Sequence, residues 1–187
     1  MMRKVLITGG SGLIGRRLSF LLKSRGYEVR ILSRSNNPKN SYKTFLWNIS
    51  EKTINDSAFE DLNHIIHLAG AGIADKRWSE KRKKEIIASR VASTNLLYNT
   101  VKRLKTPLDS FISASATGYY GAITSETIFE EKDKPAKDFL GKVCSLWEDS
   151  IFQFNEIKIR TVALRTGIVL SKDGGALKKM KTPIITS

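Results

Sequence analysis

The chain has 187 residues, which is enough for one α/β domain with a sizeable core but short for a two-domain enzyme. Hydrophobic residues make up 41% of the chain, and no apolar run reaches the roughly 18 residues needed to cross a bilayer, so we expect no membrane association. The net charge of +14 suits phosphate binding, but no nucleic-acid-binding motif accompanies it, and we do not expect nucleic acid as a partner.

The basic residues are densest between 76 and 85, where Lys81, Arg82, Lys83 and Lys84 cover more than half of a helical turn. A run of this kind predicts a face in contact with solvent. Nucleic-acid binding through this helix is the weaker alternative, and strong salt dependence of any affinity would be its minimum requirement.

The few potential metal ligands are Cys144, His64 and His67, and their spacing matches no metal site, so we expect none. A lone cysteine suits a reducing compartment, and the N-terminus leads directly into a strand pattern rather than a signal peptide. We therefore expect a cytoplasmic protein. Cys144 is interpreted as a small buried hydrophobe, and the two histidines as core residues with satisfied hydrogen bonds.

Short β-branched runs alternate with longer periodic segments, which is typical of βαβ units and a parallel sheet. In chain order, the expected strands are residues 4–8, 28–32, 44–47, 64–69, 110–115 and 158–164. Helices are expected after the first strand, stopping at Gly26, and from about 79 to 104. A third helix begins near Asp138 and carries Phe139, Val143, Leu146, Trp147 and Phe154.

Six strands joined by crossovers predict a doubly wound parallel sheet with helices on both faces. We therefore expect residues 1–187 to form one three-layer α/β/α Rossmann domain that binds NAD(P).

The segment between the first strand and the first helix carries a glycine pattern typical of dinucleotide binding. Gly9 permits a tight turn, Gly12 lets the backbone approach a pyrophosphate, and Gly15 allows close packing of helix on strand. The helix N-terminus adds free N–H groups and the positive end of its dipole. The cofactor-binding residues predicted here are Thr8, Gly9, Gly10, Ser11, Gly12, Leu13, Ile14 and Gly15.

The end of the second strand selects the cofactor. An acidic residue there would accept hydrogen bonds from the ribose 2′-hydroxyl of NAD, but this chain has Ser33 and Arg34 instead. A guanidinium can pair bidentately with a 2′-phosphate. We therefore predict that NADP (as NADPH) is preferred over NAD.

The chain resembles the extended short-chain dehydrogenase/reductase superfamily in its NAD(P)-dependent epimerase/dehydratase branch. The resemblance rests on the glycine motif, on the strand-four motif at His67-Leu68-Ala69-Gly70 and on the segment from Ser113 to Gly121. It extends over most of the chain to the atypical YfcH-like subgroup, which is often labelled nucleoside-diphosphate-sugar epimerases. The resemblance implies that Leu68, Ala69 and Gly70 line the cofactor, and that Ser115 orients a substrate carbonyl or hydroxyl.

Two departures from the family pattern stand out. Active members carry a Tyr and a Lys four residues apart on the helix after strand five, but here Leu140 and Cys144 occupy those positions, and we expect a chain without the Tyr-x-x-x-Lys pair. Tyr119 or Tyr120 is the substitute acid we consider. The family also continues into a C-terminal substrate-binding region, most of which is absent from this sequence.

These features predict an NADP(H)-binding, epimerase-like oxidoreductase that acts on a nucleotide sugar or another small carbonyl or hydroxyl compound. A non-catalytic NADP(H) sensor or scaffold is the alternative, which the missing Tyr and Lys favour. The sequence leaves the substrate and the oligomeric state open, with a homodimer as the assembly to test.

Overall fold

We describe the protein from a computed structural model that places residues 2–36, 41–122 and 126–177. Within these residues the main strands are β1 Lys4–Thr8, β2 Glu28–Ser33, β3 Lys43–Asn48, β4 Thr53–Ile54, β5 His64–His67, β6 Ser110–Ala116 and β7 Arg160–Thr166. They form one sheet in the order β4-β3-β2-β1-β5-β6-β7. All neighbours are parallel except β4, which pairs antiparallel with β3 at the edge.

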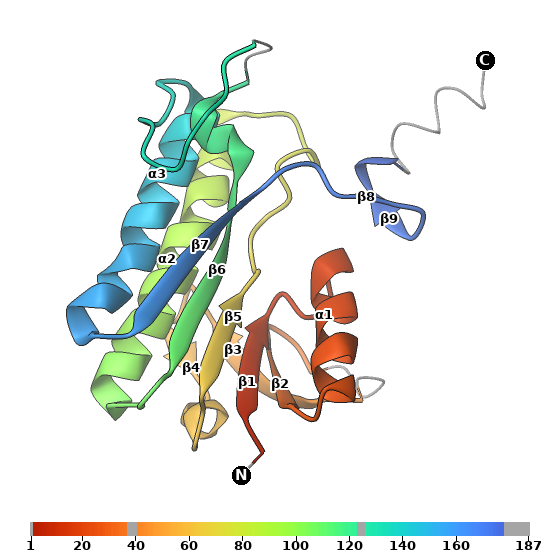
Figure 1. Ribbon diagram of the computed structural model, residues 1–187, viewed down its shortest axis with the longest axis vertical. Helices are drawn as coiled ribbons and strands as arrows, with labels where there is room; N and C mark the ends of the chain where they lie inside the picture. Colours follow the sequence, from red (N-terminus) through yellow and green to blue (C-terminus); the bar gives the residue numbers. More distant parts are fainter. Residues whose placement is uncertain (1, 37–40, 123–125, 178–187) are drawn as a thin grey trace.

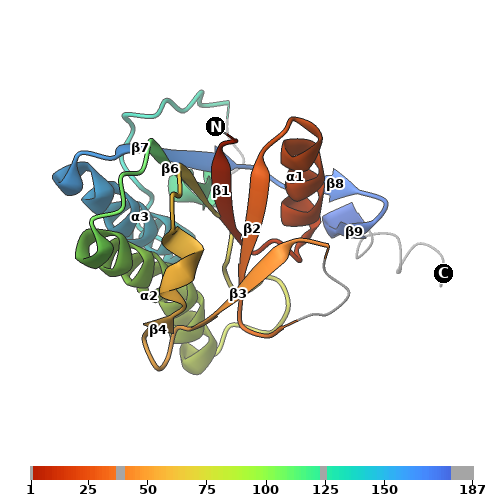
Figure 2. The same cartoon turned by 90° about the horizontal axis from the view of Figure 1, so that it is seen from below.

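Helices cover both faces of this sheet. Helix α1 (Leu13–Ser24) lies on one face, and α2 (Glu80–Leu104) and α3 (Phe139–Phe152) lie together on the other (Figures 1 and 2). The strand order reverses between β1 and β5, which is the crevice where doubly wound sheets bind their ligands. The predicted three-layer Rossmann fold is confirmed.

The larger core lies between the sheet and the pair α2 and α3. Phe111 of β6 stacks on Phe154 with 3.8 Å between ring centroids, and both side chains are fully buried. The α1 face has a smaller core around Val5, Ile7, Val29 and Ile31. Its outer part is less covered, since Leu164 of β7 is 50% exposed.

Local sequence signals set the helix ends. The Ser79 hydroxyl accepts from the Arg82 N–H at the start of α2, and the Asp138 carboxylate accepts from the Gly141 N–H at the start of α3. After α1 the chain turns at Gly26, whose φ of +81° favours glycine. These three boundaries agree with the sequence predictions.

Several details differ from the predictions. Strand β4 and the small hairpin of β8 (Leu170–Ser171) and β9 (Gly174–Gly175) were not predicted, because two-residue strands carry no readable periodicity. Phe154, which was expected on the third helix, lies beyond α3 in the 3₁₀ turn Gln153–Ile157. Arg82 is buried, although the basic run predicted a solvated face.

No helix in the described ranges is both long and apolar enough to cross a membrane. Among the same residues, no cluster of three or more His, Cys, Asp or Glu side chains is arranged to hold a metal ion.

Candidate dinucleotide and substrate site

The glycine turn between β1 and α1 is packed so tightly that side chains cannot replace its glycines. Gly9 has φ +70°, and a Cβ there would lie 2.8 Å from the carbonyl carbon of Leu68. A Cβ on Gly15 would collide with the Gly9 carbonyl, and the Gly12 N–H donates to that same oxygen at 3.0 Å. The predicted roles for Gly9 and Gly15, a tight turn and close helix packing, match this geometry.

The N-terminus of α1 is open to an anion. Its N-cap, Gly12, provides no side-chain hydrogen bond, and the first turn contains no acidic residue. The N–H groups of a first helical turn have no partner inside the helix, and with the helix dipole they favour negative charge. This arrangement fits the pyrophosphate of a dinucleotide.

A groove of about 370 Å³ opens in front of this turn. Leu68 and Ala114, from the ends of β5 and β6, contribute to its wall. In Figure 1 the β8–β9 hairpin lies beyond the amino end of α1. Residues of this hairpin and of the segment just before it line the side of the groove that faces α1. The remaining lining residues are Gly9, Gly12, Leu13, Ile14 and Gly15 on the α1 side and Ile168, Val169, Gly175 and Ala176 on the hairpin side.

The other predicted turn residues contribute in different ways. A Cβ on Gly10 would meet the Ile31 side chain at 2.5 Å, so this glycine serves packing against β2. Ser11 is exposed, and its carbonyl accepts from Arg16 Nη1 at 3.0 Å. Thr8 is fully buried beneath the turn rather than facing the groove.

Thr8 joins the turn to the centre of the sheet through a hydrogen-bond chain. Its Oγ1 accepts from the N–H groups of Leu68 and Ala69, each at 3.1 Å. Its single hydrogen is therefore donated to His67 Nδ1, 2.7 Å away. The other ring nitrogen, Nε2, then carries the proton and donates to Ser93 Oγ at 3.1 Å. The donor count fixes the tautomer of His67 and links the turn, strand β5 and helix α2.

Burial, with the nearby charge of Arg90 as a smaller cause, lowers the pKa of His67 from 6.5 to about 3. His67 is therefore a neutral core histidine at ordinary pH, as predicted. His64 is half-buried and shares a hydrogen bond of 2.9 Å with Ser110 Oγ.

The end of β2 places the predicted cofactor selector beside the turn. Thr8 pairs with Leu32 in the parallel register of β1 and β2, so Ser33 and Arg34 follow at the same edge of the sheet as the glycines. Ser33 is half-buried, and Arg34 is exposed. No acidic residue occurs between Glu28 and Glu51.

At the end of β6, Ser115 forms a hydrogen bond with the carboxylate of the Glu148–Arg165 ion pair. Its hydroxyl donates to Glu148 Oε1 at 2.6 Å, and the side chain is 2% exposed. Arg165 of β7 binds the same carboxylate through Nε and Nη2, at 2.9 and 2.8 Å. This bidentate hydrogen bonding to Glu148 raises the pKa of Arg165. Ser115 thus sits at the predicted place, with its hydroxyl held by Glu148.

The two candidate tyrosines flank Arg165. Its guanidinium lies 3.5 Å from the Tyr119 ring centroid, and its Nη1 donates to the Tyr120 hydroxyl at 2.7 Å. Tyr120 donates in turn to the Glu130 carbonyl at 2.9 Å. Sequence reasoning named both tyrosines but did not identify Glu148 and Arg165 as members of the site, because their pairing depends on contacts between α3 and β7.

Helix α3 carries Leu140 and Cys144, the two residues predicted to stand at the family's Tyr and Lys positions. Leu140 and Cys144 both face Gly118, where an added Cβ would lie 3.4 Å from Leu140 Cβ and 3.9 Å from Cys144 Sγ. Burial and the neighbouring Glu148 raise the pKa of Cys144 to about 11, so the thiol is neutral at ordinary pH. The interpretation of Cys144 as a buried hydrophobe agrees with its 3% exposure.

The expectation that the chain has no Tyr-x-x-x-Lys spacing is corrected, because Tyr98 and Lys102 have this spacing. They lie on α2, and Tyr98 donates to Glu156 at 3.0 Å in the turn that precedes β7. That turn leads into the amino end of β7, opposite the edge where the glycine turn lies (Figure 1). This pair therefore does not replace Leu140 and Cys144.

Comparisons with known proteins agree with this geometry. The NAD-dependent epimerase/dehydratase family matches residues 5–140. An epimerase family protein of Staphylococcus aureus (strain NCTC 8325 / PS 47) is 34% identical over 182 residues, which make up 97% of this chain and 60% of that protein. The Arabidopsis thaliana chloroplastic homologue of epimerase family protein SDR39U1 is 35% identical, over 94% of this chain and 52% of its own. The chain thus spans between half and two thirds of these relatives.

Two solved structures share the fold over nearly the whole chain. The nucleoside-diphosphate sugar epimerase from Corynebacterium glutamicum superposes with a TM-score of 0.81 at 31% identity, covering 100% of this chain and 38% of that one. Human epimerase family protein SDR39U1, solved with NADPH, gives a TM-score of 0.76 at 26% identity, covering 96% and 59%.

Proposed function

The chain belongs to the NAD-dependent epimerase/dehydratase family, and we propose that it binds NADP(H) in the glycine-turn groove and acts on a small carbonyl or hydroxyl compound such as a nucleotide sugar. The observation that carries the cofactor proposal is the uncapped, acid-free start of α1 together with Ser33 and Arg34 at the end of β2. The NADPH in the human relative's structure supports the choice of cofactor.

Each part of the groove has a distinct task in this proposal. The backbone of Gly9, Gly12 and Gly15 and the first-turn amides of α1 hold the pyrophosphate. Arg34 pairs with the 2′-phosphate, and Ser33 offers a hydroxyl beside it. Leu68, Ala69 and Gly70 line the path from the ribose to the nicotinamide. When bound, the dinucleotide supplies the hydride chemistry, and the protein supplies orientation and proton transfer.

At the substrate end, we propose that Tyr120 or Tyr119 supplies the proton. Arg165 holds both rings and is itself fixed by Glu148. Ser115 is proposed to orient the substrate oxygen, which requires its hydroxyl to leave Glu148 Oε1. In the arrangement described here, Ser115 also braces the carboxylate that positions Arg165.

The cofactor proposal is tested by titrating NADPH and NADH against the protein and an Arg34→Ala variant. Losing a charged hydrogen bond to the 2′-phosphate should weaken NADPH binding by about 10- to 100-fold and leave NADH binding unchanged. Arg25→Ala is the matched control, since Arg25 is also exposed but follows α1 at its far end. Equal effects of Arg34→Ala on both cofactors, or none on either, would contradict the proposal.

Turnover is tested by incubating the protein and a full-length relative with deuterated NADPH and a panel of small carbonyl compounds, and separately with NADP⁺ and nucleotide sugars that carry deuterium on their hydroxyl-bearing carbons. Deuterium transfer that Tyr120→Phe or Tyr119→Phe reduces supports the acid assignment. The second candidate, a non-catalytic NADP(H) sensor, is favoured by Leu140 and Cys144 at the family's Tyr and Lys positions. It predicts tight NADPH binding without deuterium transfer by either protein.

A further inference from the structure

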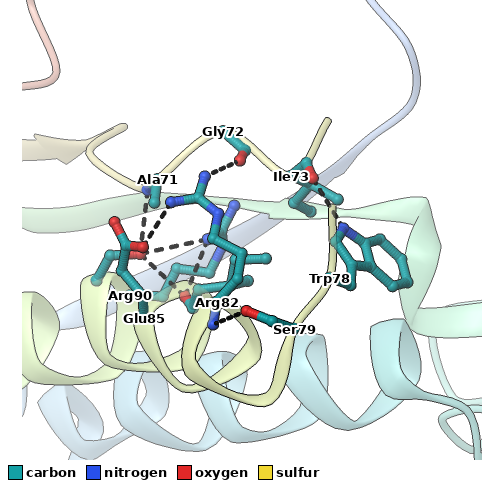
Figure 3. A network of polar contacts seen from close by, with 10 residues as sticks. Ala71, Gly72, Ile73, Trp78, Ser79, Arg82, Glu85 and Arg90 are labelled. Atoms are coloured by element: carbon teal, nitrogen blue, oxygen red, sulfur yellow. Dashed lines mark hydrogen bonds and ion pairs between the residues drawn. The ribbon is translucent and has the colours of Figure 1, made fainter. Parts of the chain in front are cut away.

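Helix α2 presents two arginines on its buried face, next to the loop that follows β5. Arg82 and Arg90 lie two turns apart, and each is only 7% exposed (Figure 3). The Nε atom of each is buried without a hydrogen-bond partner. Arginines are rarely buried in this way unless they are paired, so each requires a physical explanation.

The two guanidiniums differ in how their charge is balanced. Arg82 pairs with Glu85 at 2.7 Å and donates to the Gly72 carbonyl. Arg90 has no carboxylate partner among the described residues. It donates to the Ile86 carbonyl at 3.0 Å and lies 5.1 Å from the Trp147 ring centroid. Burial without an opposite charge lowers the pKa of Arg90 and costs folding free energy.

The unbalanced charge lies against the predicted cofactor path. A Cβ on Gly70 would lie 3.3 Å from Arg90 Cζ and 3.5 Å from its Nη2, so the guanidinium packs against the backbone of Gly70. Gly70 is exposed and follows Leu68, which lines the groove. Since glycine has no side chain, a ligand passing Gly70 can approach Arg90 closely.

The same charge also acts on Cys144, the residue at the family's Lys position. The Cys144 thiol is buried and neutral, so α3 itself provides no cation there. The other nearby guanidinium, that of Arg165, is neutralised by both oxygens of Glu148. Arg90 is thus the cation that remains available at this position within the described part of the chain.

We infer that Arg90 supplies, from α2, the positive charge that family members with a Tyr-x-x-x-Lys pair place on α3, and that it binds the ribose hydroxyls at the nicotinamide end of NADP(H). This inference rests on the proposed function. It makes Arg90 a binding residue for the nicotinamide half of the dinucleotide, whereas Arg34 is proposed to bind the adenine half.

The contributions of Arg90 and Arg34 can be separated by comparing two ligands. NADPH carries both halves of the dinucleotide, and adenosine 2′,5′-bisphosphate carries the adenine half alone. Arg90→Met should weaken NADPH binding about tenfold and leave bisphosphate binding within about twofold. Arg34→Ala should weaken both ligands. Arg90→Lys, which retains a cation, should recover most of the NADPH affinity. Binding is followed by calorimetry, and the nicotinamide emission of NADPH provides a second readout.

The matched control is Arg82→Met, which removes a buried arginine from the same helix without touching Gly70. It should lower the melting temperature but leave the ratio of the two affinities unchanged. If Arg90→Met does not fold, Arg90→Gln, which retains donors without the charge, takes its place. Equal weakening of both ligands by the Arg90 variants, or no weakening of NADPH, would overturn the inference while the proposed function stands. If the unaltered protein binds neither ligand, both fail.

Discussion

The two ends of the proposed site are built from different kinds of chemical group. At the proposed phosphate end, between β1 and α1, the groups proposed to bind are backbone amides exposed by glycines, and no side chain caps the helix. At the proposed substrate end, between β6 and α3, charged side chains satisfy one another, with Glu148 held by Ser115 and Arg165. A backbone site depends on local conformation, whereas a side-chain site depends on contacts between distant elements. The two ends should therefore respond differently to substitution.

The largest effect is expected at the substrate end, on stability. Glu148→Gln would leave the half-buried Arg165 without its carboxylate, and breaking such a pair typically costs about 3 kcal/mol. Urea unfolding measures this loss. The control is Glu80→Gln, which breaks the exposed pair with Lys83 and should change the free energy of unfolding much less, because solvent screens that pair. Similar losses in the two variants would show that the Glu148 pair does not organise this end.

The next largest effect, and the largest on NADPH binding, is expected from Gly15→Val. The added side chain meets the Gly9 carbonyl, so the turn must open and NADPH affinity should fall by about 100-fold or more, which is roughly 2.7 kcal/mol. Gly26→Ala is the control, because Gly26 also has positive φ but has nothing within 4 Å of an added Cβ. The control should lose stability and retain its NADPH affinity. An unchanged affinity in Gly15→Val would place the ligand elsewhere.

The smallest effect concerns His67, which links the glycine turn to helix α2 through Thr8 and Ser93. Its folded-state pKa of about 3 lies below its ordinary value of 6.5, so between these values the unfolded chain binds a proton that the folded chain does not. Stability should therefore fall as the pH drops below 6.5, by at most about 1.4 kcal/mol per pH unit. Urea unfolding of the protein and His67→Gln at pH 7 and pH 5 tests this.

Between pH 7 and pH 5 the stability change due to His67 can be measured apart from that of the carboxylates. Hydrogen bonds to Arg103 and Lys4 lower the pKa values of Asp56 and Asp61, so their contribution to stability is lost only at more acidic pH. Burial also lowers the pKa of the half-buried His64, so His64 contributes to the same pH dependence of stability. The variant His64→Gln measures this contribution. If His67→Gln shows the same loss between pH 7 and pH 5 as the unaltered protein, the account of His67 as a neutral buried link is wrong.

The conformation of the glycine turn could be predicted from the sequence because its signals are local. The spacing of Gly9, Gly12 and Gly15 after a buried strand, and the absence of acid after Ser33, can be read without tertiary contacts. The doubly wound parallel sheet followed from the alternation of strands and helices, apart from the two-residue strands. The core position of His67 followed from its place in a buried strand.

The surroundings of the side chains on α2 were less predictable, because they depend on contacts with distant parts of the chain. An arginine in a basic helical run is assigned to solvent by default, yet Arg82 is buried beneath the Gly72 carbonyl. Arg90 packs on Trp147, a ring 57 positions later in the chain, and no local pattern indicates that contact. The spacing of Tyr98 and Lys102 shows the opposite problem, because a motif spacing without its structural context carries no function.

Hydrogen–deuterium exchange with and without NADPH tests the central claim most directly. If the dinucleotide lies across the glycine turn, NADPH should slow exchange at the amides of Gly12 to Gly15 and of Leu68 to Gly70. Amides around the separate cleft of about 650 Å³ between β4 and α2, near Asn99 and Arg103, should be unaffected. Protection confined to that cleft, or no protection at the glycine turn under saturating NADPH, would contradict the account.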